Sequence, residues 1–184
     1  VLGDAPDFHI VPVGNAGNYT AYFRGYSEEL ERSATTKLPR MFGFQAEGSA
    51  PIVRGEVVKN PDTIASAIRI GNPASWHLAT EAHKASNGYF GAISDAKILE
   101  AQRILSAEVG IFVEPASAIS VAGLLERAEA GQIPRGSTVV LTVTGHGLKD
   151  PQWALKTASG EDITPTVVPV DTAEVASVLG LAKA

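Results

Sequence analysis

The sequence predicts an α/β fold, in which a largely parallel twisted sheet is flanked by helices. Two observations support this fold class. Strand-like and helix-like segments alternate along the chain. The strand-like segments are hydrophobic throughout instead of alternating with polar residues, which is typical of parallel strands covered on both faces. In such sheets, ligands collect at the carboxyl ends of the strands, so a site is expected at a strand exit.

The first predicted elements are a strand and a helix. Phe8–Val13 is rich in β-forming residues, and Asn18 follows in a favourable N-cap position. Tyr22, Tyr26 and Leu30 then recur at helical spacing and mark one face of a helix. The next segments predict, in order, a buried strand at 41–45, a turn-rich excursion at 53–60, and helices at 62–70 and 74–85.

The second half of the chain continues the alternation. Tyr89–Ile93 is strand-like, and Ser94 caps a helix that ends at Gly110. Pro115 suits the first turn of the next helix, because no N–H donor is needed there. The β-branched run at 137–145 predicts a last strand that is buried on both sides.

Length and composition allow a sizeable core. The 184 residues are 45% hydrophobic and 19% charged, which fits one large domain or a domain with a small lobe. We expect an α/β domain at residues 1–158 and a C-terminal appendage at 159–184. The sequence opens on Val1 and not on methionine, so we expect it to be part of a longer protein.

Charge and residue types argue against several classes of partner. The formal net charge is −5 and the basic residues are scattered, so we expect no nucleic-acid partner. No apolar run approaches the length of a membrane span, so we expect no membrane partner. The chain has no cysteine, and its four histidines lack the spacing of metal ligands, so we expect no metal site.

The first candidate site is the glycine-rich exit of the first strand. There, a strand end meets a helix start, which presents unpaired N–H groups to an anion. Glycine at this point allows positive φ angles and close approach of the backbone. The alternative is a tight turn with an asparagine cap. The residues concerned are Gly14, Asn15, Ala16, Gly17 and Asn18.

The second candidate site is the exit of the last strand. Thr144 ends the β-branched run, and Gly145 and Gly147 keep its surroundings open. A threonine hydroxyl there can donate or accept a hydrogen bond without bringing charge. The alternative is a threonine chosen only for its β propensity.

Taken together, the two exits resemble those of a known enzyme family. The motifs GNAGN, RIGNPASW, VEPASA and TVTGHGLKDP occur in the same order in the C-terminal half of the threonine synthase family. That family belongs to the fold-type II pyridoxal-phosphate enzymes, whose large domain has the tryptophan synthase beta-like fold. The similarity runs from about Gly3 to Pro151.

The resemblance implies a role for each strand exit, and it implies that the Schiff-base lysine lies outside this chain. Residues 14–18 would hold the 5′-phosphate of pyridoxal phosphate, mainly through backbone N–H groups, and Thr144 would hydrogen-bond the ring nitrogen. The Schiff-base lysine belongs to the preceding half of the family's proteins, so no catalytic residue is expected in this chain. Lys149 is interpreted as an ion-pairing residue with Asp150.

The family also implies an activity. The parent enzyme would be a lyase of threonine biosynthesis that converts O-phospho-L-homoserine and water to L-threonine and phosphate. It would be a cytoplasmic homodimer, completed by the missing N-terminal half of the same enzyme. Three alternatives remain open at this point: a threonine dehydratase-like lyase, a non-enzymatic α/β module that binds anions or nucleotides, and an isolated structural fragment with no ligand.

Overall fold

The computed structural model describes residues 2–156 and 161–181 of the chain. The chain divides into two compact units, Val1–Pro151 and Gln152–Ala184. The domain boundary predicted at 158/159 lies outside the described residues and stays a prediction.

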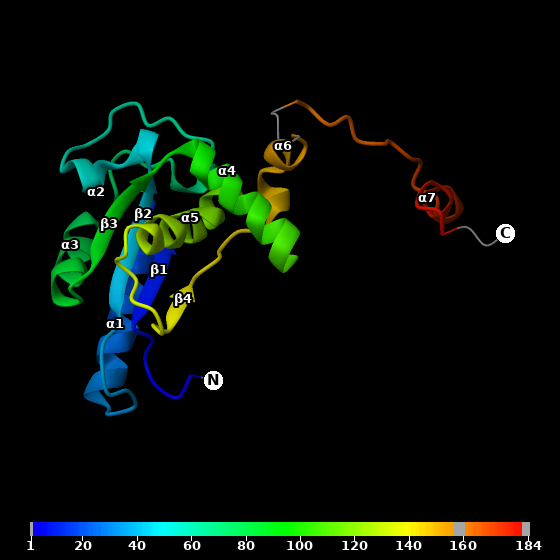
Figure 1. The fold of residues 1–184 in the computed structure, drawn as a ribbon. Helices are drawn as coiled ribbons and strands as arrows, with labels where there is room; N and C mark the ends of the chain where they lie inside the picture. Colours follow the sequence, from blue (N-terminus) through cyan, green and yellow to red (C-terminus); the bar gives the residue numbers. More distant parts are fainter. Residues whose placement is uncertain (1, 157–160, 182–184) are drawn as a thin grey trace. The chain divides into compact units, whose positions relative to one another are not determined.

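The first unit is built on a four-stranded sheet, whose strands are labelled in Figure 1. Its strands lie in the order β3-β2-β1-β4, and every pairing is parallel. The predicted α/β class with a parallel sheet is therefore confirmed. The strands are β1 (Phe8–Pro12), β2 (Arg40–Ala46), β3 (Tyr89–Ile93) and β4 (Val139–Leu141).

Helices cover both faces of this sheet (Figure 1). Phe8 and Ile10 of β1 face one cluster of buried residues, to which α4 and α5 contribute. Val11 and Val13 face a second cluster, formed with α1 and α3. Because successive strand residues point to opposite faces, a strand covered on both sides must be apolar at nearly every position. The bounds of these helices are Gly17–Glu31 for α1, Trp76–Ala85 for α3, Asp95–Ile104 for α4 and Pro115–Glu129 for α5.

Several predicted boundaries are confirmed by local chemistry. Ser94 is the N-cap of α4, and its hydroxyl accepts a hydrogen bond from Lys97 N–H. The helix continues through a π-helical turn at Leu105–Val109 and ends at Gly110, which has a φ of 72°. Pro115 is the first residue of α5. The remaining short helices are α2 (Pro51–Arg54), α6 (Pro151–Ala154) and, in the second unit, α7 (Thr172–Val178).

Two predicted elements differ from the structure. The helix expected at 62–70 is wrong: only Ser66–Ile68 forms a 3₁₀ turn. Its neighbours use their polar groups in tertiary contacts, because Thr63 donates to Asp95 and Arg69 donates to the Thr63 carbonyl. The last strand is also shorter and less buried than expected, since β4 lies at an edge of the sheet and is only half-buried.

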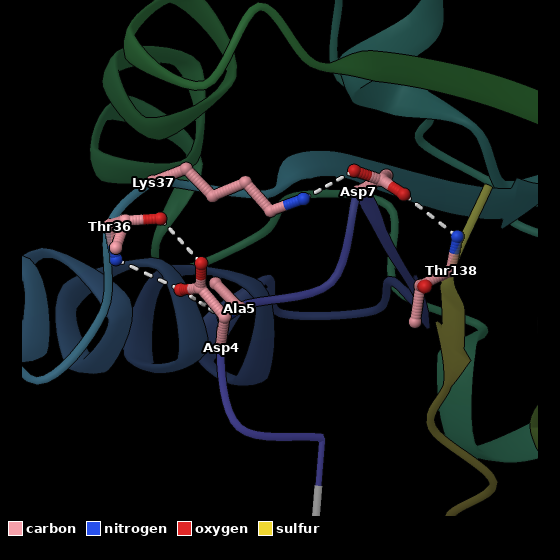
Figure 2. Close-up of polar contacts among 6 residues, drawn as sticks. All are labelled: Asp4, Ala5, Asp7, Thr36, Lys37 and Thr138. Carbon is pink, nitrogen blue, oxygen red and sulfur yellow. Dashed lines mark hydrogen bonds and ion pairs between the residues drawn. The ribbon is translucent and has the colours of Figure 1, made fainter.

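The N-terminal segment is fixed by two carboxylates, drawn in Figure 2. Asp4 accepts hydrogen bonds from the N–H and the hydroxyl of Thr36. Asp7 pairs with Lys37 and accepts from the N–H of Thr138, 2.8 Å away. These contacts tie the entrance of β1 to the segments that lead into β2 and β4. They also hold the pKa values of both carboxyl groups below the usual 3.8.

His9 is a buried polar residue on β1. Its Nε2 lies 2.7 Å from Thr142 Oγ1, and its ring lies 4.8 Å from the ring of Tyr22. Burial lowers the pKa of His9 from 6.5 to about 4. The folded chain therefore holds this imidazole neutral at pH values where an unfolded chain protonates it.

Among the described residues, no helix combines the length and apolar character that crossing a membrane requires.

We expect the free energy of unfolding to decrease as the pH falls from 6.5 to about 4, the two pKa values of His9. In this range the unfolded state binds more protons than the folded state, which favours unfolding. The loss approaches about 3 kcal/mol at the acid end, since one pKa unit corresponds to 1.36 kcal/mol. Urea denaturation at a series of pH values measures it.

The matched variants are His9→Gln and His77→Gln, the latter at a side chain that is 86% exposed. His9→Gln should reduce the pH dependence to the part that His83 contributes, since burial lowers the pKa of His83 as well, and His77→Gln should leave it unchanged. The contribution of Asp4 and Asp7 is lost only below 3.8, so it does not overlap this window. An equal slope in both variants would contradict the role of His9.

Candidate cofactor-binding site

A cavity of about 690 Å³ lies at the carboxyl edge of the sheet. Four segments line it: the β1–α1 loop, the 3₁₀ turn at Ser66–Ile68, the start of α5, and the chain after β4. The structure brings all six predicted site residues to this cavity: Gly14, Asn15, Ala16, Gly17, Asn18 and Thr144. Two exits that are about 130 positions apart meet because β1 pairs directly with β4.

The β1–α1 loop differs in detail from the sequence interpretation. The residue with a positive φ is Ala16, at 63°, and it is also the N-cap of α1. Neither Gly14 nor Gly17 has a positive φ, so the expectation of left-handed glycines here is wrong. The N-cap expected at Asn18 is wrong as well, since α1 begins at Gly17.

The loop leaves donors free at the start of α1. Ala16 provides no side-chain cap. Tyr19 N–H donates to Asn18 Oδ1, and Asn18 Nδ2 donates to the Pro12 carbonyl. Within the described part of the chain, the N–H groups of Gly17 and Asn18 have no hydrogen-bond partner. Free N–H groups at the positive end of a helix attract an anion.

The two glycines of the loop serve different purposes. A Cβ on Gly14 would lie 3.1 Å from Ile68 Cα and 3.2 Å from the Ala67 carbonyl oxygen, so Gly14 permits the close approach of the Ser66–Ile68 turn. A Cβ on Gly17 would meet no protein atom within 4 Å. A side chain at position 14 would therefore be crowded by the neighbouring backbone, whereas one at position 17 would not.

Asn15 fastens the loop to the start of α3. Its side-chain Oδ1 accepts a hydrogen bond from Ala74 N–H at 3.2 Å, and its backbone carbonyl accepts from Ser75 N–H at 3.0 Å. The Asn15 side chain thus has a partner within the fold. Its contribution to a ligand would come from the backbone of the loop that it holds.

The start of α5 fixes the backbone of the second exit. Thr144 N–H donates to Ser117 Oγ at 2.7 Å, and Glu114 N–H donates to the Gly145 carbonyl at 3.0 Å. His146 forms an antiparallel bridge with Val113. The Thr144 side chain is exposed at the cavity, and its hydroxyl has no partner among the described residues.

Sequence reasoning did not predict that Glu114 lines the cavity, and it gave Lys149 the wrong partner. Glu114 lines the cavity, although it is only 2% exposed, and Lys149 pairs with it instead of with Asp150. Asp150 accepts a hydrogen bond from Ser66 at 2.5 Å. The signal for Glu114 was a carboxylate directly before the proline that opens α5, a position that also suits the helix dipole.

This geometry defines a class of protein. A parallel sheet with a cavity at its carboxyl edge, a free helix N-terminus on one side and an uncharged hydroxyl on the other, is typical of α/β proteins that bind small anionic ligands. The comparisons with known proteins are more specific. Residues 1–145 match the family model described as "Pyridoxal-phosphate dependent enzyme". The chain belongs to this family, and pyridoxal phosphate is the family's cofactor.

Curated relatives narrow the similarity further. The chain is 56% identical over 182 residues to the threonine synthase of Mycobacterium tuberculosis. The matched region covers 99% of this chain and 49% of the relative. It is 54% identical over 161 residues to the threonine synthase of Synechocystis, covering 88% of this chain and 42% of the relative. The chain thus spans about half the length of the curated relatives it matches.

A solved structure supports the fold. The L-serine ammonia-lyase of Rhizomucor miehei superimposes with a TM-score of 0.65 over 81% of this chain and 49% of that chain. At 22% identity, this likeness shows a shared fold. The family match confirms the predicted membership of the fold-type II pyridoxal-phosphate enzymes, and the superposition agrees with their fold.

We expect the two loop glycines to respond differently to alanine. Gly14→Ala should destabilise the fold by about 1–3 kcal/mol, because a new methyl group is forced against the Ile68 backbone. Gly17→Ala should be neutral or stabilising within about 1 kcal/mol, since its Cβ enters open space at a helix start. Chemical denaturation without ligand measures both. A large loss for Gly17→Ala would contradict the open space at this position.

Proposed function

We propose that this chain is the cofactor-binding part of a threonine synthase, a lyase that converts O-phospho-L-homoserine and water to L-threonine and phosphate with pyridoxal phosphate. The observation that carries the proposal is the meeting of the GNAGN loop and Thr144 at one cavity. Sequence identity of 56% to a threonine synthase, extending over 99% of the chain, favours this reaction over that of other family members.

The residues of the cavity fit the cofactor. The phosphate would bind at residues 14–18, where Gly17 and Asn18 have free N–H groups. Gly17 has no Cβ, so the space beside its backbone is open to a ligand. The ring nitrogen would face Thr144, whose hydroxyl is unpartnered and whose backbone is held by Ser117. A ligand with a phosphate at one end and a hydrogen-bond acceptor at the other matches these two ends of the cavity.

When bound, pyridoxal phosphate supplies an electron sink that stabilises negative charge next to the substrate's amino group. The chain's own contribution is to set the strength of that sink. A neutral hydroxyl at Thr144 does not favour a protonated ring nitrogen, whereas a carboxylate would. The free N–H groups at the start of α1 anchor the phosphate without adding a titratable group near the reacting atoms.

The chain does not provide the family's Schiff-base lysine. Lys149, which lines the cavity, is engaged with Glu114 and lies in the sequence context Gly-Leu-Lys-Asp. We propose that the lysine is supplied by a second half of the enzyme, which accounts for the half-length match to the relatives. That the complete enzyme is a cytoplasmic homodimer is part of the same proposal and rests on the family resemblance.

We expect the complete enzyme to release phosphate and form threonine from O-phospho-L-homoserine. The chain of 184 residues alone should not turn over this substrate, because it lacks the acid/base group that the Schiff-base lysine provides. A coupled phosphate assay with amino-acid analysis of the product measures both.

Two results would contradict the assignment as a threonine synthase. Turnover of threonine to an oxo acid, with no action on O-phospho-L-homoserine, would indicate a dehydratase-like lyase. Tighter binding of nucleotides than of pyridoxal phosphate by the complete protein would indicate a binding module.

We expect Gly17→Ala to weaken binding of pyridoxal phosphate by roughly ten- to hundredfold, because a methyl group keeps the phosphate from N–H groups and hydrogen bonds to charged groups contribute about 1.5–3 kcal/mol. The fold should tolerate the change, as the open space at this position implies. Equilibrium titration of the complete enzyme with pyridoxal phosphate measures the loss.

Titration with pyridoxal, which lacks the phosphate, is the matched control. Wild type and Gly17→Ala should bind pyridoxal equally weakly if the loop recognises only the phosphate. Were both ligands weakened to the same extent, residues 14–18 would be a turn without a role in phosphate binding.

A further inference from the structure

Glu114 is a buried carboxylate at the edge of the cavity. It is 2% exposed and serves as the N-cap residue of α5. Its Oε2 lies 3.0 Å and its Oε1 3.3 Å from the ammonium group of Lys149. Among the described residues, Lys149 is the only ion-pair or hydrogen-bond partner of this carboxylate. A buried charge without a partner is strongly unfavourable, so Glu114 depends on this lysine.

The dependence is not mutual. The side chain of Lys149 is 60% exposed, so water can solvate its ammonium group if the carboxylate is removed. A carboxylate left behind in the buried site has no such alternative. Breaking the ion pair would therefore cost the buried Glu114 carboxylate far more than the exposed Lys149 ammonium group.

The carboxylate presses against the residue that follows Thr144. A Cβ on Gly145 would lie 2.0 Å from Glu114 Oε1 and 2.2 Å from its carboxyl carbon. Any side chain at position 145 would therefore require the Glu114 carboxylate to move. Glu114 N–H also donates to the Gly145 carbonyl at 3.0 Å, so both the backbone and the side chain of Glu114 define the position of Gly145.

Thr144 is thus held from two sides. Ser117 Oγ accepts its N–H, and Glu114 fixes the next residue along the chain. Lys149 lies in the 3₁₀ turn Gly147–Lys149 that follows, so its pairing with Glu114 folds the segment 144–149 back onto the start of α5.

We propose that Lys149 is a positioning residue: it holds and neutralises the buried Glu114 carboxylate against Gly145, and so keeps the Thr144 hydroxyl in place at an electrically neutral ring-nitrogen end of the cofactor site. This inference rests on the proposed function, because it presumes that Thr144 faces the ring nitrogen. It gives the lysine of the cavity a role that needs no covalent bond to the cofactor.

The test compares Lys149→Met in two backgrounds of the complete enzyme. With Glu114 present, Lys149→Met should raise the Kd of pyridoxal phosphate by roughly tenfold or more, since it leaves a buried carboxylate unpaired. It should also shift the absorbance band of the bound cofactor, because an uncompensated negative charge beside Thr144 favours a protonated ring. In the Glu114→Gln background, Lys149→Met should change neither quantity.

Three matched variants complete the design. Lys149→Arg keeps the charge and should retain the wild-type band and affinity. Lys97→Met removes the lysine of another ion pair, with Glu126 on α5, and should leave both unchanged. Thr144→Val removes the hydroxyl itself and should weaken cofactor binding.

The outcomes separate this inference from the proposed function. If Thr144→Val weakens binding while Lys149→Met behaves like Lys97→Met, the inference fails and the assignment of Thr144 stands. If Thr144→Val has no effect, the assignment of Thr144 fails, and the inference with it. The comparison within the Glu114→Gln background contains no unpaired buried charge, so it remains decisive even if Lys149→Met alone does not fold. An equal loss in that background would overturn the inference.

Discussion

The parallel pairing of β1 with both β2 and β4 is the constraint on which the rest of the structure depends. It places β1 in the interior of the sheet and requires apolar residues on both of its faces. It also makes the exits of β1 and β4 emerge at the same edge, side by side. The cavity is a result of this pairing, because its two functional ends come from segments that are adjacent in space and distant in sequence.

The α5 helix adds a second constraint at that edge. Ser117 in its first turn accepts the N–H of Thr144, and its N-cap residue Glu114 donates its N–H to the Gly145 carbonyl. Glu114 and Ala116 line the cavity, while Ser117 and Ser120 are fully buried. The small residues of this helix allow it to lie close to the sheet, as shown by Gly123, where a Cβ would be 2.3 Å from the Phe44 ring. The α5 helix therefore provides both the close packing against the sheet and the polar contacts that fix Thr144 and Gly145.

Much of the fold could be predicted from the sequence, because its signals are local. Hydrophobic runs identified the strands, and Ser94 and Pro115 identified helix starts through their own side chains. The rest depends on tertiary contacts. Residues 62–70 look helical by propensity, but Thr63 and Arg69 bond elsewhere. The left-handed conformation at Ala16 also has no sequence signal, since alanine is an unusual residue for it. The partner of Lys149 could not be read from the sequence, because Asp150 is adjacent and Glu114 is 35 positions away.

The open space beside Gly17 has a consequence for which substitutions can accumulate at this position during evolution. Glycines such as Gly48 and Gly71 are fixed by the fold, because a Cβ at either would lie within 2 Å of a backbone carbonyl oxygen, so a chain that lost its ligand would still need them. Gly17 is different, because alanine there would cost the folded chain nothing and would make a better helix. Only selection for an occupant of the site can keep a glycine at this position. Its loss in a descendant would therefore record the end of ligand binding before any change in the architecture could reveal it.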